Sequence, residues 1–262
     1  MKKMIALLAA LLLVFAVAVS QAEAGQDLLA RIQAKGALTI ATEGNWSPWT
    51  YHDEADQLTG FDIEVGTLLA EGLGVQPVFK EAEWSALLAG VETGVFDLAC
   101  NGVGYTEERA LKYDFSEPYV YTESVLVVRG DNTTIQTLED LAGKTTSNSP
   151  NSTYAQLAES LGAQVTYAET LDQTLALVLQ GRVDATINAR GSVEDYLGQH
   201  PDANIRIVQS FPGEPVCIPI KKGEDSATLV SAVNEILSAA RDSGKLSELS
   251  LKYFNADLTT KQ

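Results

Sequence analysis

The alternation of strand and helix patterns along the chain is the feature that most limits its fold. Apolar runs typical of strands lie at 38–42, 77–80 and 95–99, with helical spacing after the first two and the start of a helix after the third. The same order begins again at 143–149 and continues to 205–208. Such alternation favours parallel sheets covered by helices on both faces. The sequence therefore predicts an α/β protein of two similar lobes.

A turn with two glycines follows the third strand. The segment 100–109 reads Cys-Asn-Gly-Val-Gly-Tyr-Thr-Glu-Glu-Arg, and Thr106 can cap a helix that includes Arg109. Glycines at the carboxyl end of a strand let the backbone approach a small ligand, and the arginine offers a planar fork to a carboxylate. We expect a binding protein whose ligand has a carboxylate. The alternative is a surface salt bridge of Arg109 with Glu107 or Asp114.

The N-terminus has the pattern of a secretory signal peptide. Lys2 and Lys3 precede an apolar run, and Ala22 and Ala24 are the small residues expected before a cut after Ala24. The apolar run of about 16 residues is shorter than the roughly 20 that a transmembrane helix needs. We expect residues 1–24 to be removed and the mature protein to be periplasmic or otherwise secreted.

Charge and composition exclude several classes of function. The chain has 35 Asp and Glu against 18 Lys and Arg, a formal net charge of -17, which disfavours nucleic acid and anionic lipid as partners. His52 and His200 are far apart, and no cluster has metal-ligand spacing. We expect no metal and no cofactor.

Other conspicuous residues have structural interpretations beside functional ones. Trp46 and Trp49, in a loop after the first strand, either cover neighbouring core or form walls of a pocket. Asp62 is predicted to cap a helix, which is a structural role. Cys100 and Cys217 either form a disulfide, which an oxidising compartment permits, or remain two separate buried thiols.

Five stretches in register resemble the polar amino-acid-binding proteins of bacterial ABC importers. They are LTIATEGNWSPW (38–49), LTGFDIEV (58–65), TEERALKYDFSEPY (106–119), LEDLAGKT (138–145) and GRVDA (181–185). The similarity spans essentially the whole mature chain and looks most like binders of cystine and related amino acids. It implies a two-lobed clamshell, the type II periplasmic binding protein fold. Each lobe would have a mostly parallel central sheet with one antiparallel strand and flanking helices.

The resemblance also implies the domain boundaries. The chain would cross between the lobes near 119–124 and near 210–216. Lobe I would then consist of residues 25–121 plus 213–262, and lobe II of residues 122–212.

A disulfide is a further implication of this family's connectivity. The antiparallel strand 216–220 would lie beside 96–100 in lobe I, which brings Cys100 and Cys217 close together. Facing residues on antiparallel strands have Cα separations of about 4.5 to 5.5 Å, within disulfide range. A bridge between the two cysteines is therefore expected.

Carried over by position, the family's ligand site falls on residues of both lobes. Arg109 matches the arginine that holds the ligand α-carboxylate. Ser152 and Thr153 match the start of a helix whose free N–H groups face the same carboxylate. Trp46 and Trp84 match aromatic walls around the ligand side chain. Each tryptophan could instead be ordinary core.

Glu43 matches an acidic residue that approaches the far end of the ligand, although a solvated loop carboxylate is the alternative. Gly102 and Gly104, with the neighbouring Asn101, match the corner whose backbone carbonyl contacts the α-amino group. Gly104 stands where the family usually has Ser or Thr, so a hydroxyl is missing.

A second departure concerns the ligand ammonium. Ala189 aligns with the aspartate that usually neutralises it, and Asn188 is its neighbour. A buried ammonium without a counter-charge is costly. Either Glu43 or Asn188 takes over, or the ligand is not a standard α-amino acid; Asn188 could equally be an ordinary residue at a strand end.

The function implied by the resemblance is capture of a polar amino acid, with cystine favoured, by a monomer that delivers it to the membrane permease of an ABC importer. An enzyme is the alternative, because cyclohexadienyl or arogenate dehydratases share this architecture. Their chemistry needs a positioned acid, and Glu43 is the only carboxylate that we can place near the cleft. We therefore expect a binding protein and not an enzyme.

Overall fold

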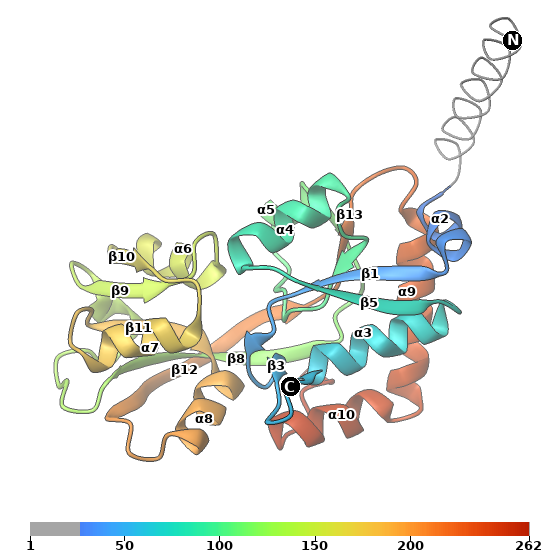
Figure 1. The fold of residues 1–262 in the computed structure, drawn as a ribbon. Helices are drawn as coiled ribbons and strands as arrows, with labels where there is room; N and C mark the ends of the chain where they lie inside the picture. The colour runs from blue at the N-terminus through green and yellow to red at the C-terminus, as the bar shows by residue number, and fades with distance from the viewer. Residues whose placement is uncertain (1–26, 262) are drawn as a thin grey trace, which may run out of the picture.

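The computed structural model describes residues 27–261, which form two halves joined by a pair of long strands (Figure 1). The predicted signal peptide, residues 1–24, lies outside the described residues. Each half has its own five-stranded sheet with helices packed against it. The predicted α/β fold with two lobes is confirmed.

The first sheet belongs to the half that contains both described ends of the chain. Its strands, in spatial order, are β5 (Gln76–Glu81), β1 (Ala37–Thr42), β6 (Leu98–Ala99), β13 (Pro219–Lys221) and β7 (Tyr113–Phe115). Strand β1 is parallel to β5 and to β6, whereas β13 is antiparallel to β6 and β7. The single antiparallel strand beside the third parallel strand agrees with the prediction. Strand β7 was not predicted, because its three residues lie in a segment without a clear pattern.

Helices cover both faces of this sheet, and they are α2 (Leu28–Lys35), α3 (Phe61–Gly72), α4 (Trp84–Thr93), α9 (Ala227–Asp242) and α10 (Lys245–Phe254). On one face, buried residues of α2, α3, α9 and α10 pack with those of β1, β6 and β13. On the other face, Leu87 and Val91 of α4 pack against Ala41 and Ala99. Because alternate residues of a strand point to opposite faces, each strand contributes to both layers of the core.

The second sheet has the strand order β10 (Gln164–Tyr167), β9 (Thr145–Asn148), β11 (Ala185–Ala189), β8 (Val120–Arg129) and β12 (Ile205–Val216). Strands β10, β9 and β11 are parallel, and β8 is the antiparallel member. The flanking helices are α6 (Thr153–Ser160), α7 (Leu171–Leu179) and α8 (Arg190–Gln199), and a short 3-10 helix, η1, spans Leu138–Leu141. Val125 and Val127 pack on one face, and Leu126 and Val128 pack on the other.

Strands β8 and β12 connect the two halves (Figure 1). They pair antiparallel from Ile205 opposite Arg129 to Val216 opposite Val120. Val216 also bridges to Gly104, in the glycine corner of the first half. Both strands extend well beyond their apolar segments, 124–128 and 205–208, because strand-to-strand pairing continues through polar residues that have no local strand signal.

A small three-stranded sheet lies beside the first half and consists of β2 (Asn45–Trp46), β3 (Thr50–His52) and β4 (Leu58–Thr59). The two tryptophans of this segment, Trp46 and Trp49, have different roles. Trp49 is buried core that packs edge-on against Phe61, whereas Trp46 stacks on Trp49 with ring centroids 5.4 Å apart. Of the two roles considered from the sequence, Trp49 therefore has the core role and Trp46 lines a pocket.

The expected disulfide is absent: Cys100 and Cys217 are buried free thiols. Ile220 pairs with Leu98, and continuing that register places Ile218 opposite Cys100. Cys100 then packs with Ile218 in the core, and Cys217 points to the opposite face of its strand. Proximity of the two strands was predicted correctly, but the register separates the sulfur atoms.

The predicted cap of α3 is also wrong. Gly60 occupies the N-cap position, and Asp62 lies inside the first turn with no exposed surface. Its carboxylate accepts hydrogen bonds from the Gly102 N–H (2.5 Å) and the Tyr119 hydroxyl (2.7 Å). Asp62 therefore has the expected structural role, but it connects α3 to the glycine corner and to the start of β8.

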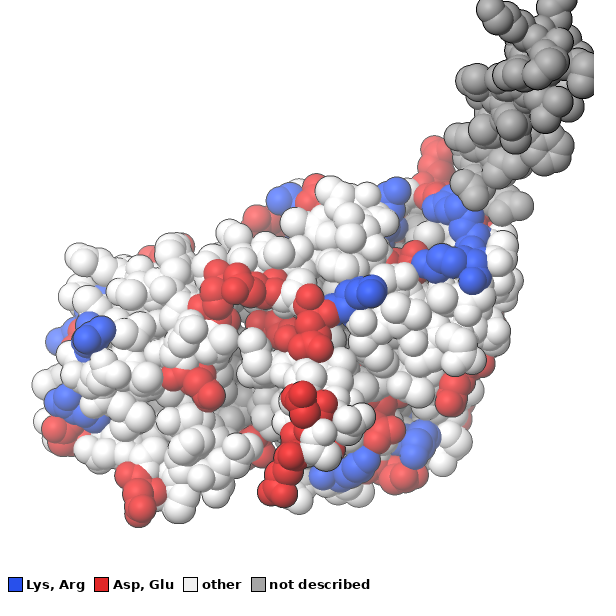
Figure 2. All heavy atoms as spheres, viewed as in Figure 1, with Lys and Arg blue, Asp and Glu red and all other residues white. Residues whose placement is uncertain are grey.

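Acidic side chains outnumber basic ones on the face drawn in Figure 2, in both halves. This distribution agrees with the net charge of -17 and opposes polyanionic partners. Among residues 27–261, no helix has the length and apolar character to cross a bilayer.

Candidate functional site

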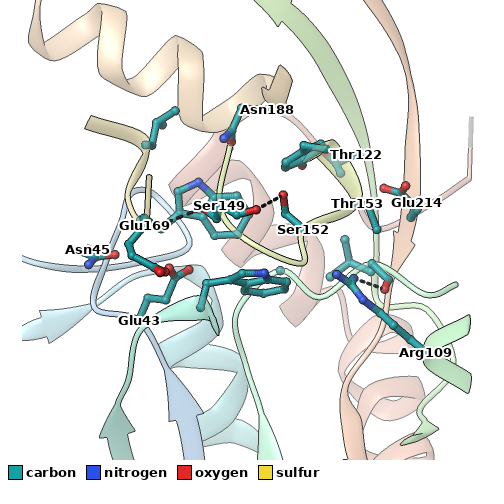
Figure 3. A pocket seen from close by; sticks show the side chains of 17 residues that line it. Glu43, Asn45, Arg109, Thr122, Ser149, Ser152, Thr153, Glu169, Asn188 and Glu214 are labelled. Atoms are coloured by element: carbon teal, nitrogen blue, oxygen red, sulfur yellow. Dashed lines mark hydrogen bonds between the residues drawn. The ribbon is translucent and has the colours of Figure 1, made fainter. Parts of the chain in front are cut away.

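A cleft lies between the two halves, close to β8 and β12 (Figure 3). Nine of the ten predicted site residues line it: Glu43, Trp46, Trp84, Gly102, Gly104, Arg109, Ser152, Thr153 and Asn188. The tenth, Asn101, is fully buried directly behind the cleft wall. Sequence reasoning did not identify the other lining residues, which are Asn45, Thr122, Ser149, Tyr154, Glu169, Leu171, Glu214 and Val216.

Arg109 lies on α5 (Glu107–Ala110), one turn after the glycine corner, because Thr106 caps that helix by accepting from the Arg109 N–H (3.1 Å). One guanidinium nitrogen donates to the Gly104 carbonyl (2.9 Å), and the group lies over the Trp84 ring, 5.3 Å from its centroid. Among residues 27–261 no ion pair involves Arg109. The surface salt bridge is therefore not formed, and the fork is directed at the cleft.

Burial lowers the pKa of the Arg109 guanidinium, and the negative charge of Glu214 acts in the opposite direction. The group nevertheless remains charged at neutral pH, because a free arginine titrates far above it. The other guanidinium nitrogen lies 3.5 Å from the Asn151 carbonyl in the second half. Arg109 thus places a partly buried positive charge where the two halves meet.

The N-terminus of α6 faces the cleft from the second half. Ser152 caps the helix by accepting from the Ala155 N–H (3.1 Å), and its hydroxyl donates to the Ser149 carbonyl (2.7 Å). Within the described part of the chain, the N–H groups of Thr153 and Tyr154 have no acceptor. Free N–H groups and the helix dipole favour an anion at this position.

Aromatic rings line two sides of the cleft, since Trp46 and Trp84 both contribute to its wall. Gly102 has a φ of +56°, and a Cβ there would lie 2.6 Å from the Trp46 ring. Glycine is required at this position for both reasons, the backbone angle and the close approach of the indole. The corner therefore determines where the Trp46 ring can lie.

Glu43 lies at the other end of the cleft from Arg109 (Figure 3). Asn101 holds it twice: the side-chain amide donates to the Glu43 carboxylate (2.5 Å), and its oxygen accepts from the Glu43 N–H (2.8 Å). Burial raises the pKa of Glu43 to about 7, partly offset by the Asn101 hydrogen bond. Asn101 therefore orients a cleft residue and does not line the cleft itself.

Glu169 faces Glu43 from the second half, in the loop between β10 and α7 (Figure 3). One of its carboxylate oxygens is buried and has no hydrogen-bond partner in the described structure. Its charge contributes to the raised pKa of Glu43. A buried acceptor without a partner is costly, so this end of the cleft is suited to a cation or a hydrogen-bond donor.

Asn188 lines the cleft at the end of β11, and Ala189 beside it is buried and uncharged. The Asn188 side-chain oxygen already accepts from the Ala189 N–H (2.9 Å). Its remaining hydrogen-bonding group is the NH₂, which is a donor and cannot accept a hydrogen bond from an ammonium.

The missed residues have weak local signals. Glu169 follows a strand at its carboxyl end, where ligands often bind in α/β sheets, and this position could have identified it. Glu214 lies on β12, in a stretch with no motif. Neither residue matched a family motif, and only the folded chain shows that both reach the cleft.

The cleft therefore combines a cationic and N–H-rich part, aromatic walls and a distal pair of carboxylates. Within residues 27–261 no group of three or more His, Cys, Asp or Glu could hold a metal ion. The arrangement is suited to holding a small zwitterion with an extended side chain.

Comparisons with known proteins identify the same class. The family model of bacterial extracellular solute-binding proteins, family 3, matches residues 38–256. The L-cystine-binding protein TcyA of Bacillus subtilis is 40% identical over 234 residues, which cover 89% of this chain and 87% of that protein.

Two solved structures extend the comparison. The L-cystine solute receptor of Neisseria gonorrhoeae, in an unliganded open conformation, is 38% identical, with 89% of this chain and 99% of that chain covered and a TM-score of 0.58. An ancestral arginine-binding protein bound to arginine is 31% identical, with 84% of this chain and 98% of that chain covered and a TM-score of 0.78.

Proposed function

Because the chain belongs to family 3 of the bacterial extracellular solute-binding proteins, we propose that it captures a polar amino acid, with cystine favoured, and delivers it to the permease of an ABC importer. The proposed lobes are residues 25–121 plus 213–262 and residues 122–212, with the ligand between them. The enzyme alternative has no support, because both the matched family and the relative TcyA are described as binding proteins.

The observation that carries the proposal is the pairing of Arg109 with the N-terminus of α6. The guanidinium lies on one half and the free N–H groups of Thr153 and Tyr154 on the other, and both belong to the cleft wall. A carboxylate held between them satisfies both at once. Ligand binding would then favour closure, because only the closed form offers both sets of donors.

The distal carboxylates restrict the side chain of the amino acid. Glu43 and Glu169 face each other from the two halves. A ligand with a second cationic group would lie between them and offset their charge: arginine and lysine carry such a group alone, and cystine carries an ammonium beside its second carboxylate. An acidic side chain without a neighbouring cation would only add a third negative charge at this end, so glutamate and aspartate are disfavoured.

The proposed route to the site of action is export with removal of residues 1–24, which leaves a monomer in the periplasm or another extracytoplasmic space. The family is one of extracellular proteins, and the apolar N-terminal run after Lys2 and Lys3 has the pattern of a signal peptide.

A thermal-shift panel tests the proposal. The mature protein is melted with L-cystine, L-arginine, L-lysine, L-glutamine and L-glutamate, one at a time. A ligand that binds only the folded state at 100 times its Kd adds about 2.7 kcal/mol of stability. We expect a rise in Tm with cystine or a basic amino acid and none with glutamate. No rise with any of the amino acids would contradict the proposal.

A further inference from the structure

An α-amino acid bound through its carboxylate brings an ammonium into the same end of the cleft. That ammonium needs an acceptor or a negative charge there. Ala189 offers neither, and the Asn188 oxygen is already engaged with the Ala189 N–H. Glu43 lies at the other end with Asn101. None of the side chains considered from the sequence therefore supplies a counter-charge, and the backbone carbonyl of the Gly102–Gly104 corner offers only a neutral acceptor.

Glu214 is a carboxylate at the correct end. It lies on β12, and its side chain belongs to the cleft wall on the same side as Arg109 (Figure 3). Within residues 27–261 no hydrogen bond or ion pair engages its carboxylate, although the group is close enough to Arg109 and Tyr154 to influence both electrostatically. The Arg109 guanidinium and the Glu214 carboxylate therefore lie near each other without forming an ion pair. Arg109 can then bind the carboxylate of an α-amino acid while Glu214 binds its ammonium.

Gly104 makes room for this carboxylate. Its φ lies outside the left-handed region, so the backbone does not require glycine there. A Cβ at this position, however, would lie 2.8 Å from Cβ and 3.4 Å from Cγ of Glu214. A Cβ atom is not the free end of a flexible side chain, so it cannot move aside cheaply. A serine or threonine at 104 would displace Glu214 from the cleft.

We propose that Glu214 is the counter-charge of the ligand α-ammonium, and that Gly104 lacks a side chain so that Glu214 can occupy this place. The two departures from the family pattern, glycine at 104 and alanine at 189, then have one cause. The carboxylate that is missing at the end of β11 is supplied from β12. The inference rests on the proposed function, since it requires an α-amino acid as ligand.

Glu214→Gln tests the inference, because it keeps the shape of the side chain and removes the charge. Binding is measured by calorimetry with L-cystine, L-arginine and L-glutamine, and with analogues that lack one α-ammonium: the mixed disulfide of L-cysteine and 3-mercaptopropionate, 5-guanidinopentanoate and 4-carbamoylbutanoate. We expect about 100-fold weaker binding of each amino acid that the wild type binds, the size of a lost charged hydrogen bond. Binding of the matching analogue should change by less than about threefold, which is below 1 kcal/mol.

Glu123→Gln is the matched control. Glu123 lies on the neighbouring strand β8, is exposed and pairs with Arg190 outside the cleft wall. Its substitution should leave all affinities unchanged. Gly104→Ala is the second variant, and it should weaken amino-acid binding through displacement of Glu214. Tm values of all variants establish that they are folded, and Glu214→Ala, which also removes the charge, replaces Glu214→Gln if that variant is not.

The outcomes separate the two proposals. If the wild type binds none of the amino acids of the thermal-shift panel, the proposed function fails. If the wild type binds one of them and Glu214→Gln binds it equally well, or loses the amino acid and its analogue to the same extent, the role of Glu214 is wrong while the proposed function stands. Unchanged binding by Gly104→Ala would overturn the explanation of the glycine.

Discussion

At the scale of single residues, Arg109 is a cation of the cleft wall that forms no ion pair with any of residues 27–261. It is held by the Gly104 carbonyl and by the Trp84 ring, and no carboxylate neutralises it in the described structure. Arg109→Ala should weaken binding of L-cystine by about 3–5 kcal/mol, because the ligand carboxylate then loses its charged partner in a buried site. Titration calorimetry measures the loss.

Arg129→Ala is the control for this experiment. Arg129 is at the end of β8 and pairs with Asp131 at the surface, so its loss should not change the affinity. An Arg109→Ala protein that binds as well as the wild type would show that the carboxylate is held elsewhere.

Glu43 gives a prediction about pH. Burial raises its pKa from 4.5 to about 7. The folded protein therefore binds more protons at this residue than the unfolded chain does between pH 4.5 and 7, and the free energy of unfolding falls as the pH rises through that range. The Glu43→Gln variant has no titrating group at this position, so its free energy of unfolding lacks this decrease with pH.

The measurement is Tm against pH for the wild type and for Glu43→Gln. The Tm of the variant relative to the wild type should increase between pH 5 and pH 8. Asp62, whose pKa burial also raises to about 7, and His52, whose pKa a hydrogen bond to Glu81 raises, titrate in both proteins and cancel in the comparison. A constant difference between the two profiles would mean that Glu43 is already ionised at pH 5.

At the scale of elements, Asp62 joins three parts of the first half. It lies in α3, accepts from the N–H of Gly102 in the corner after β6, and accepts from the hydroxyl of Tyr119 next to β8. Tyr119→Phe removes one donor from a fully buried carboxylate. The free energy of unfolding should fall by about 1–3 kcal/mol, which urea denaturation measures.

Tyr121→Phe is the matched control, since Tyr121 is on β8, is partly buried and has no hydrogen bond from its hydroxyl among the described residues. It should change the stability by less than about 0.5 kcal/mol. Equal stability of the two variants would show that the Asp62 connection contributes nothing.

The elements also show what could be predicted from the sequence. Apolar runs and helix stops identified the main strands and helices of both sheets, because those signals are local. The register between β6 and β13 is a long-range property, and the predicted disulfide failed for that reason. Asp62 resembled a cap because it stands near the start of α3, but its partners, Gly102 and Tyr119, are 40 and 57 positions away in the chain.

The same distinction applies to the cleft. Arg109 and Trp46 belong to motifs that are continuous in the sequence, and both were expected to line it. Glu169 and Glu214 reach the cleft through the loop after β10 and through the long strand β12. No motif marks either position. The place of Glu169 after a strand is a weak signal, whereas Glu214 has no local signal and is identified only by the arrangement of both sheets.

At the scale of the whole molecule, the arrangement of the two halves is more like that of an arginine-bound relative than that of an unliganded open one. The TM-score is 0.78 with the arginine-bound ancestral protein and 0.58 with the open cystine receptor, although the open receptor is the more similar in sequence, at 38% against 31% identity. Since both are related to this chain, we attribute the lower score to the separation of the lobes. The approach of Arg109 to the Asn151 carbonyl across the cleft agrees with a closed form.

Strands β8 and β12 are the two strands that connect the sheets, so we expect them to carry any hinge motion between the halves. Without ligand, Glu43 and Glu169 repel each other across the cleft and oppose closure. An amino acid with a second cationic group, such as the distal ammonium of cystine, offsets that repulsion while its α-carboxylate engages Arg109. We therefore expect the ligand-free protein at pH 8 to be open and to close when L-cystine binds.

Small-angle X-ray scattering measures this change as a decrease in the radius of gyration on addition of saturating L-cystine. Glu169→Gln lacks one of the two repelling charges, so its ligand-free form should be more compact than that of the wild type at pH 8. Glu159→Gln is the control, because Glu159 is an exposed residue of α6 that bonds to Tyr167. A wild-type radius that stays constant while calorimetry shows binding would mean that the ligand enters a cleft that is already closed, and the repulsion would then have no part in the motion.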